Sequence, residues 1–295
     1  MPRTEHVTPY GNYKGYYTKR GNQTSDPRLK VLSLNLFKGK RVLDIGCNEG
    51  SVTCEIALRY EAQEVVGVDI DAELVSRAWR HRREVWSLQP PKPLPRVAQG
   101  DTPEEENMGK YPSDCSLRSE SNGCATDQPE NDVYFPECFP SLFGPVPIPL
   151  QHSVFPNNVS FHQNDWANQG CAADELGYNV VVAFSVSKWI HVHGGDDGIK
   201  QFFSRVRQVL ATRATKESPG IFLLEAQPWA GYHSAMRKAN LSRPKEQKPL
   251  ENLKLSPDEF PNVLSELGFS KPHCAGIVGE GGFKRSIDIY ELHLG

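Results

Sequence analysis

VLDIGCNEG, residues 42–50, decides the fold, because a buried strand runs directly into a glycine-rich turn. A second apolar segment, VVGVD at residues 65–69, follows and ends in an acid. Glycine lets the backbone turn tightly and approach a ligand, and an acid at the tip of the next strand accepts hydrogen bonds from both hydroxyls of a ribose. Gly46 and Asp69 stand at a spacing that fits this arrangement. The pair predicts a nucleotide-like cofactor pocket.

Two classes of cofactor use such a pocket. Dinucleotide-binding enzymes carry G-x-G-x-x-G, whose second glycine makes room for a pyrophosphate, and here that position is Asn48. The chain instead has Asp44 two residues before Gly46, and then G-x-x-x-G as far as Gly50. This pattern is typical of sites for S-adenosylmethionine, which has no phosphate to cradle. We therefore expect S-adenosylmethionine, with Asp44 facing its methionine end and Asp69 its ribose.

Composition predicts a single large domain in a reducing compartment. The chain has 295 residues, 38% of them hydrophobic, which is enough for a sizeable core. Its seven cysteines are scattered and lack a C-x-x-C, so neither a disulfide framework nor a zinc site is expected. The amino terminus lacks the apolar region of a signal peptide, and no run is long enough to span a bilayer. We expect a soluble protein of the nucleus or cytoplasm.

The net charge of -3 conceals that the chain outside residues 101–137 is basic. Residues 101–137 contain ten Asp or Glu and two Lys or Arg, which leaves 26 acids and 31 bases in the remainder. Basic residues are dense before the first strand and again at residues 77–83. A solvated helix face is the ordinary explanation of the second cluster. The distribution nevertheless leaves room for an anionic partner.

Strands and helices alternate along the chain, which favours a doubly wound parallel sheet. After the two strands above, apolar spacing predicts helices at residues 72–86 and 199–210, and a helix from Ser256, opened by a capping box, to Gly268. Further strands are expected at residues 155–161, 178–184, 220–225, 274–278 and 286–292. The last two resemble the antiparallel hairpin that closes most class I methyltransferase sheets. We therefore expect a Rossmann-like, mostly parallel seven-stranded sheet.

One long segment interrupts this order. Residues 90–150 are rich in Pro, Ser, Gly and acids and show no sustained periodicity, so we expect a disordered insertion in which Tyr134, Phe135 and Phe139 are the aromatics able to dock locally. The predicted organisation is an amino-terminal segment, residues 1–30, that covers substrate and cofactor, and a methyltransferase domain, residues 31–295, that contains the insertion.

The segment after the fourth strand, residues 185–193, is expected to line the substrate site, because ligands sit at the carboxyl ends of the strands. Methyltransferases that act on amino groups usually carry Asn or Asp followed by Pro-Pro and an aromatic residue here, whereas this chain has SKWIH at residues 187–191. A lysine, a tryptophan and histidines suit a phosphate and a base better than an amine. Core packing is the alternative role of Trp189. His191 and His193 lack a third ligand, so no metal is expected.

Taken together, the motifs resemble the methylphosphate capping enzymes of the bicoid-interacting type, which methylate the 5′-terminal phosphate of small RNAs. The resemblance covers nearly the whole chain apart from the insertion. One departure is Ala226, where the family usually has proline, which relaxes the loop. The motifs are YGNY at 10–13, YY at 16–17, DPRL at 26–29, LDIGCN at 43–48, FPNNV at 155–159, SKWIH at 187–191, GDDG at 195–198 and QPW at 227–229.

The resemblance implies roles for individual residues. The residues expected around S-adenosylmethionine, or around its product S-adenosylhomocysteine, are Tyr17, Arg28, Gly46, Cys47, Asn48, Asp69, Ile70, Asn164, Asp165 and Phe184. Those expected to hold the RNA end are Tyr16, Arg20, Lys188 and Trp189. A phosphate oxygen is already an anion, so no general base is needed and catalysis would be positioning. Lys188, Arg20 and His191 would neutralise the neighbouring phosphate charges.

The leading hypothesis is an RNA 5′-γ-phosphate O-methyltransferase acting on small nuclear RNA of the 7SK type. A sister branch methylates 5′-monophosphate ends, and a third possibility is a scaffold that grips the RNA end within a ribonucleoprotein with little turnover. A small-molecule methyltransferase is disfavoured by the basic, aromatic amino-terminal segment. We expect a monomer that binds RNA and ribonucleoprotein components, with no membrane contact, in the nucleus and also the cytoplasm.

Overall fold

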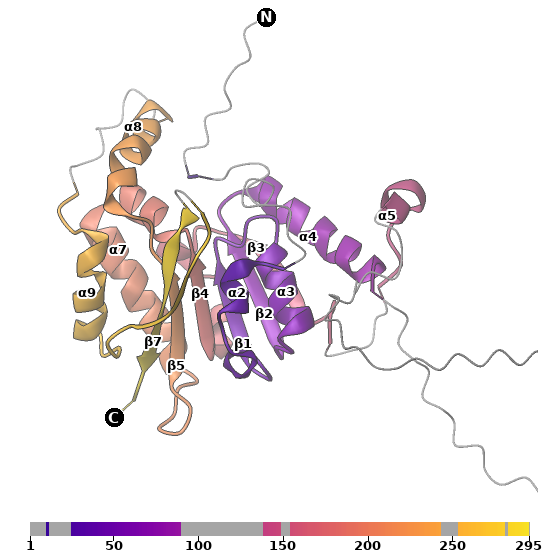
Figure 1. The fold of residues 1–295 in the computed structure, drawn as a ribbon, viewed down its shortest axis with the longest axis horizontal. Coiled ribbons are helices and arrows are strands. Elements are labelled where there is room, and N and C mark those ends of the chain that lie inside the picture. The colour runs from indigo at the N-terminus through magenta and orange to yellow at the C-terminus, as the bar shows by residue number, and fades with distance from the viewer. Residues whose placement is uncertain are drawn as a thin grey trace, which may run out of the picture.

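The computed structural model describes residues 10–11, 25–89, 138–148, 154–242, 253–280 and 283–294. These residues build a seven-stranded sheet with the strand order β3-β2-β1-β4-β5-β7-β6 (Figure 1). Strands β1 to β5 are parallel, whereas β7 runs antiparallel to both β5 and β6. This confirms the predicted mostly parallel sheet with an antiparallel hairpin at its end. The strands are β1 Arg41–Ile45, β2 Glu64–Asp69, β3 Val159–Gln163, β4 Val180–Phe184, β5 Gly220–Glu225, β6 His273–Val278 and β7 Arg285–Leu292.

Helices cover both faces of the sheet, and each face has its own core. One core joins the sheet to α3 and α4, and the other joins it to α7 and α9. The α-helices are α2 Pro27–Lys30, α3 Ser51–Arg59, α4 Ala72–Ser87, α5 Cys138–Phe143, α6 Trp166–Gln169, α7 Ser187–Ala211, α8 Tyr232–Ser242 and α9 Phe260–Glu266. Short 3-10 helices are η1 Leu34–Leu36, η2 Ala172–Leu176, η3 Trp229–Gly231 and η4 Pro257–Glu259.

The burial of the central strands accounts for the continuous apolar runs in the sequence. Every residue of β1 and β4 is buried, as expected for strands covered on both faces. The register pairs Ile45 with Val68 and Phe184 with Glu225, so the carboxyl ends of β1, β2, β4 and β5 reach the same edge of the sheet. The polar residues that follow these strands therefore converge there.

The structure shifts the predicted start of the third strand and confirms the predicted start of the carboxyl-terminal helix. The third strand begins at Val159 rather than at residue 155, because Pro156 has no N–H to donate to a ladder and residues 155–158 form a turn. The capping box at the carboxyl-terminal helix is confirmed: Ser256 and Glu259 cap each other's backbone, and a 3-10 turn precedes α9.

Part of the predicted insertion is ordered against the domain. Residues 138–148 contain α5, and the segment after it meets the end of α4 (Figure 1). The indole Nε1 of Trp86 donates to the carbonyl of Pro147 at 3.2 Å, and the amide of Val146 donates to Ser87 Oγ at 2.7 Å. Residues 90–137, including Tyr134 and Phe135, lie outside the described residues, as does most of the amino-terminal covering segment, and the side chain of Phe139 is not described. No helix in the described ranges is long and apolar enough to cross a bilayer.

Candidate cofactor and substrate site

A cavity opens at the carboxyl edge of the strands, between the glycine turn and the start of α7. Its lining combines apolar side chains with acids and amides, among them Asp44, Asp69, Asn164, Phe184 and Trp189. The cavity thus lies where the strand order predicts a ligand site.

The turn between β1 and α3 presents bare backbone to this cavity. Gly46 has φ of 75°, and a Cβ atom there would lie 2.9 Å from Val186 Cγ2, so a side chain would be both strained and crowded. The amide of Gly46 donates to the carbonyl of Val68 at 2.8 Å, and the amide of Asn48 donates to Asp69 Oδ2 at 2.9 Å. The turn is therefore fixed to the end of β2 with its backbone close to the cavity.

Asp69 is the acid at the tip of β2, and only 8% of its surface is exposed. Burial raises the pKa of its carboxyl, while hydrogen bonds from the amides of Asp71 and Asn48 lower it. The amide of Ile70 also lowers it. An ionised carboxylate has about four acceptor sites, so these amides leave acceptor capacity for a ribose hydroxyl. The bare glycine turn and this carboxylate fit S-adenosylmethionine, as predicted.

Asp44 is almost completely enclosed beneath the cavity. It accepts a hydrogen bond of 2.6 Å from Thr53 Oγ1. Burial raises the pKa of Asp44 to about 6, against the opposing effects of Thr53 and of the Arg28 guanidinium. Asp44 also lines the cavity. Its place at the methionine end of the cofactor stays a prediction.

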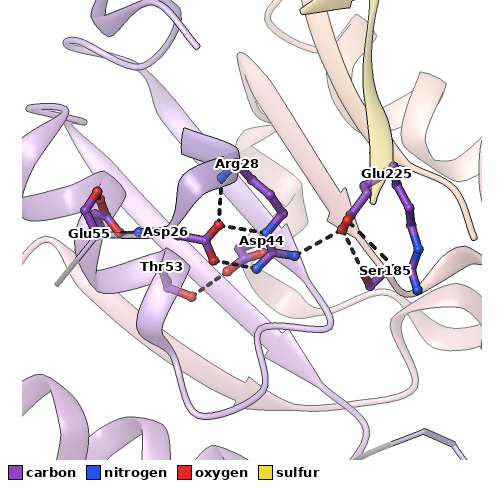
Figure 2. Close-up of polar contacts among 9 residues, drawn as sticks. Asp26, Arg28, Asp44, Thr53, Glu55, Ser185 and Glu225 are labelled. Atoms are coloured by element: carbon purple, nitrogen blue, oxygen red, sulfur yellow. Dashed lines mark hydrogen bonds and ion pairs between the residues drawn. The ribbon is translucent and has the colours of Figure 1, made fainter. Parts of the chain in front are cut away.

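Arg28 ties the segment around α2 to the centre of the sheet (Figure 2). Its guanidinium is buried and bonds Asp26 twice, at 2.9 and 2.6 Å, and Glu225 Oε2 at 3.1 Å. It also lies 4.8 Å from the ring centre of Phe184. On the other side of Glu225, the hydroxyl of Ser185 donates to the same carboxylate at 2.7 Å. Arg28 and Phe184 both line the cavity, so this ion pair network forms part of its wall.

The remaining predicted cofactor residues divide into two groups. Those that line the cavity are Asn48, Ile70, Asn164 and Asp165. Cys47 is not among the lining residues, because its side chain is 1% exposed and packs in the core against the sheet, and its role at the cofactor stays a prediction. Tyr17 lies outside the described residues.

Trp189 forms the boundary between the cofactor cavity and the face where a substrate would enter. Its indole lines the cavity and is covered by Gly11, where a Cβ atom would come within 2.0 Å of the ring. The neighbouring Tyr10 ring lies 4.5 Å from that of His193. Residues 10–11 thus line the cavity, and the covering role of the whole amino-terminal segment stays a prediction. Tyr16 and Arg20, which were expected to hold the RNA end, lie outside the described residues.

Lys188 is half-buried at the start of α7. Its ammonium group lies 4.9 Å from the centre of the Trp189 ring. Burial, together with the nearby charges of Arg285 and Lys238, lowers its pKa to about 8. Among the described residues Lys188 has no carboxylate in salt-bridge range. This cluster of like charges is a favourable place for an anion.

His191 occupies a different position from the one predicted. It is fully buried and does not line the cavity. Its Nε2 lies 2.8 Å from Asp196 Oδ1, and its ring packs among Trp229, Tyr232 and Phe260. Burial lowers the pKa of His191, although Asp196 opposes this effect. His191 therefore braces α7 against the neighbouring elements instead of contacting a phosphate.

The sequence did not reveal the residues that hold the start of α7. Ser185 adopts the left-handed region with φ of 59°. Buried Gln227 spans this turn: its Oε1 accepts from Ser187 Oγ at 3.2 Å and from the Lys188 amide at 3.1 Å, while its Nε2 donates to the Ser185 carbonyl. Arg285 Nη1 donates to Ser185 Oγ at 2.8 Å. The only signal available in the sequence was the QPW motif, which carries no such geometry.

Within the described ranges, no group of three His, Cys, Asp or Glu side chains is placed to hold a metal ion.

Two family models match the chain. The model described as Bicoid-interacting protein 3 (Bin3) matches residues 178–292, and a methyltransferase-domain model matches residues 36–85. The first match contains the start of α7, Gln227 and Arg285, and the second contains the glycine turn and Asp69.

Curated relatives match most of the chain. It is 32% identical to the 7SK snRNA methylphosphate capping enzyme of Homo sapiens over 95% of this chain, but spans only 39% of that protein. It is 29% identical to a probable RNA methyltransferase of Arabidopsis thaliana, over 90% of this chain and 74% of that protein. It is 27% identical to the U6 snRNA methylphosphate capping enzyme of Drosophila melanogaster, over 95% and 74%. The chain thus has a methyltransferase fold with S-adenosylmethionine as cofactor, and its residues 178–292 match the Bicoid-interacting protein 3 family.

Proposed function

We propose that the chain methylates the 5′ phosphate of a small non-coding RNA, with the γ-phosphate of a triphosphate end as acceptor. The observation that carries this proposal is the position of Lys188, half-buried beside Arg285 and Lys238 and next to the Trp189 wall of the cofactor cavity. Relatives named as methylphosphate capping enzymes of 7SK and U6 snRNA support it.

The chemistry asks the protein mainly to position its ligands. S-adenosylmethionine, when bound, supplies an electrophilic methyl group. A phosphate oxygen is anionic at neutral pH, so its methylation needs no general base, and alignment supplies much of the rate. Lys188 would neutralise phosphate oxygens beside the attacking one, and Trp189 would stack on the terminal base. We retain Tyr16 and Arg20 as further RNA contacts, and assign Gln227 the task of orienting Lys188.

An amine substrate fits the same site poorly. A protonated amine would meet the positive charges around Lys188, and an amine must lose a proton before it accepts a methyl group. An RNA end brings negative charge that relieves the repulsion among these cations. We further infer that the chain acts as a monomer with ribonucleoprotein components, in the nucleus and also in the cytoplasm.

The test uses methyl-labelled S-adenosylmethionine and one short hairpin RNA prepared with three different 5′ ends. Label on the triphosphate form alone is the expected result, since the proposal places the acceptor on a γ-phosphate. Preference for the monophosphate form would move the chain to the sister activity. RNA binding without label on the triphosphate, monophosphate or hydroxyl form would favour the scaffold.

Replacing Lys188 by alanine should raise the RNA concentration needed for half-maximal rate about tenfold, because one charge-assisted contact with phosphate is lost. The wild-type protein should also bind RNA less tightly as pH rises from about 7 to about 9, because the pKa of Lys188 is lowered to about 8 and the ammonium loses its proton in this range. Lys188→Arg keeps its charge and should lose this pH dependence. A half-maximal concentration unchanged in Lys188→Ala would remove Lys188 from the role.

A further inference from the structure

A second hollow lies beside α8, on the side of the domain that carries the start of α7. It is formed by η3, one face of α8 and the chain around Leu253. Its lining includes Trp229, Tyr232, His233, Met236, Arg237 and Asn240. None of its described lining residues is an acid.

One hydrophobic cluster connects the lining of this hollow with that of the cofactor cavity. Trp189 lines the cavity and packs in one hydrophobic cluster with Tyr232, which lines the hollow. Trp229 and Met236 pack against the same cluster. Lys188 lies on this side as well, since a Cβ atom on Gly231 would lie 3.4 Å from its Nζ. A chain whose first phosphate lies at Lys188 therefore needs to continue only a short way to reach the hollow.

The walls of the hollow offer ring faces and positive charge. The Trp229 and Tyr232 rings are 4.7 Å apart and tilted by 36°. The Tyr232 hydroxyl is buried and has no hydrogen-bond partner among the residues that the structure describes, which is costly unless another group or water supplies one. Arg237 and His233 are exposed at the rim on α8. Aromatic faces with neighbouring cations are the combination that binds bases and phosphates of single-stranded nucleic acid.

We propose that this hollow binds an unpaired nucleotide of the substrate RNA, downstream of the 5′-terminal one, with its base on Trp229 and its phosphate at Arg237. The inference rests on the proposed function and extends it: the enzyme reads a short single-stranded 5′ end in addition to the terminal phosphate. A fully paired blunt end would not supply such a nucleotide.

Calorimetric titration tests this with two ligands, guanosine 5′-triphosphate and an unpaired RNA hexanucleotide that begins with the same nucleotide. The wild-type protein should bind the hexanucleotide more tightly. Trp229→Ala and Arg237→Ala should each reduce that advantage about tenfold, the size of one lost stacking or phosphate contact. Trp229→Tyr retains an aromatic face and should restore most of the advantage. Lys216→Ala, an exposed charge change on the loop before β5 at the opposite edge of the sheet, is the matched control.

Two results would overturn the inference: an unchanged advantage in both alanine variants, or an equal loss of affinity for both ligands, which would indicate damage to the terminal-phosphate site. Failure of the proposed function gives a different result. The wild-type protein would then bind the hexanucleotide with the same dependence on Trp229 and Arg237, but would transfer no methyl group to it.

Discussion

Replacing Asp69 by asparagine should weaken the binding of S-adenosylmethionine about a hundredfold, because two hydrogen bonds to a charged acceptor are lost. The Asp69 carboxylate has a double task, since it already accepts from the amides of Asn48 and Asp71 at 2.9 and 3.0 Å and also has acceptor capacity for a ribose. An amide has one acceptor oxygen, and its NH₂ group would face a backbone donor. The variant therefore loses ribose contacts and also loosens the glycine turn.

Calorimetry of cofactor binding measures this effect, and Asp71→Asn is the matched control. Asp71 is two residues away and caps α4 through the amides of Glu73 and Leu74, a task that asparagine performs well. The control should bind the cofactor with nearly wild-type affinity. Equal affinities in the Asp69→Asn variant and the wild-type protein would show that the ribose is held elsewhere.

The sequence predicted the sheet and the cofactor end of the site because both depend on local patterns. A continuous apolar run identifies β4, and a glycine turn followed by an acid-tipped strand identifies Asp69. Parallel strands then bring their carboxyl ends to one edge without further information. The residues that follow β1, β2 and β4 could therefore be placed together before the structure was known.

The substrate end was less predictable because it depends on contacts between distant segments. The position of His191 just after the fourth strand predicted that it lies near the substrate, but α7 turns its ring into the packing between Trp229 and Phe260. Gln227 follows the carboxyl end of β5 and orients the start of α7. Its bond to the Lys188 amide joins residues 39 positions apart. No periodicity or motif spacing encodes such a bond, whereas side-chain packing fixes it.

Arg28 gives the largest expected effect on stability, because it is a buried charge held by two buried acids. Its bond to Glu225 joins residues 197 positions apart, so it attaches the amino-terminal segment to the end of β5. Arg28→Met keeps much of the side-chain volume but removes the cation that bonds Asp26 twice and Glu225 once. Glu225 then still faces the guanidinium of Arg285, but at the longer distance of 3.9 Å. The free energy of unfolding should fall by about 3–5 kcal/mol, the usual cost of breaking a buried pair on one side.

Urea unfolding without cofactor measures this loss and keeps it separate from ligand binding. Arg77→Ala is the control, because Arg77 also contacts two acids, Glu49 and Glu73, but is partly exposed, so its removal should cost far less stability than Arg28→Met. The double variant Arg28→Met with Glu225→Gln should lose less than the sum of its single variants, since one uncompensated charge is removed with its partner. A loss for Arg28→Met as small as that for Arg77→Ala would mean that Asp26 and Glu225 take up protons in place of the guanidinium.

Because Arg28 also lowers the pKa of Asp44, its removal should favour the protonated form of that acid as well, and the wall of the cofactor cavity would then lose charge on both sides.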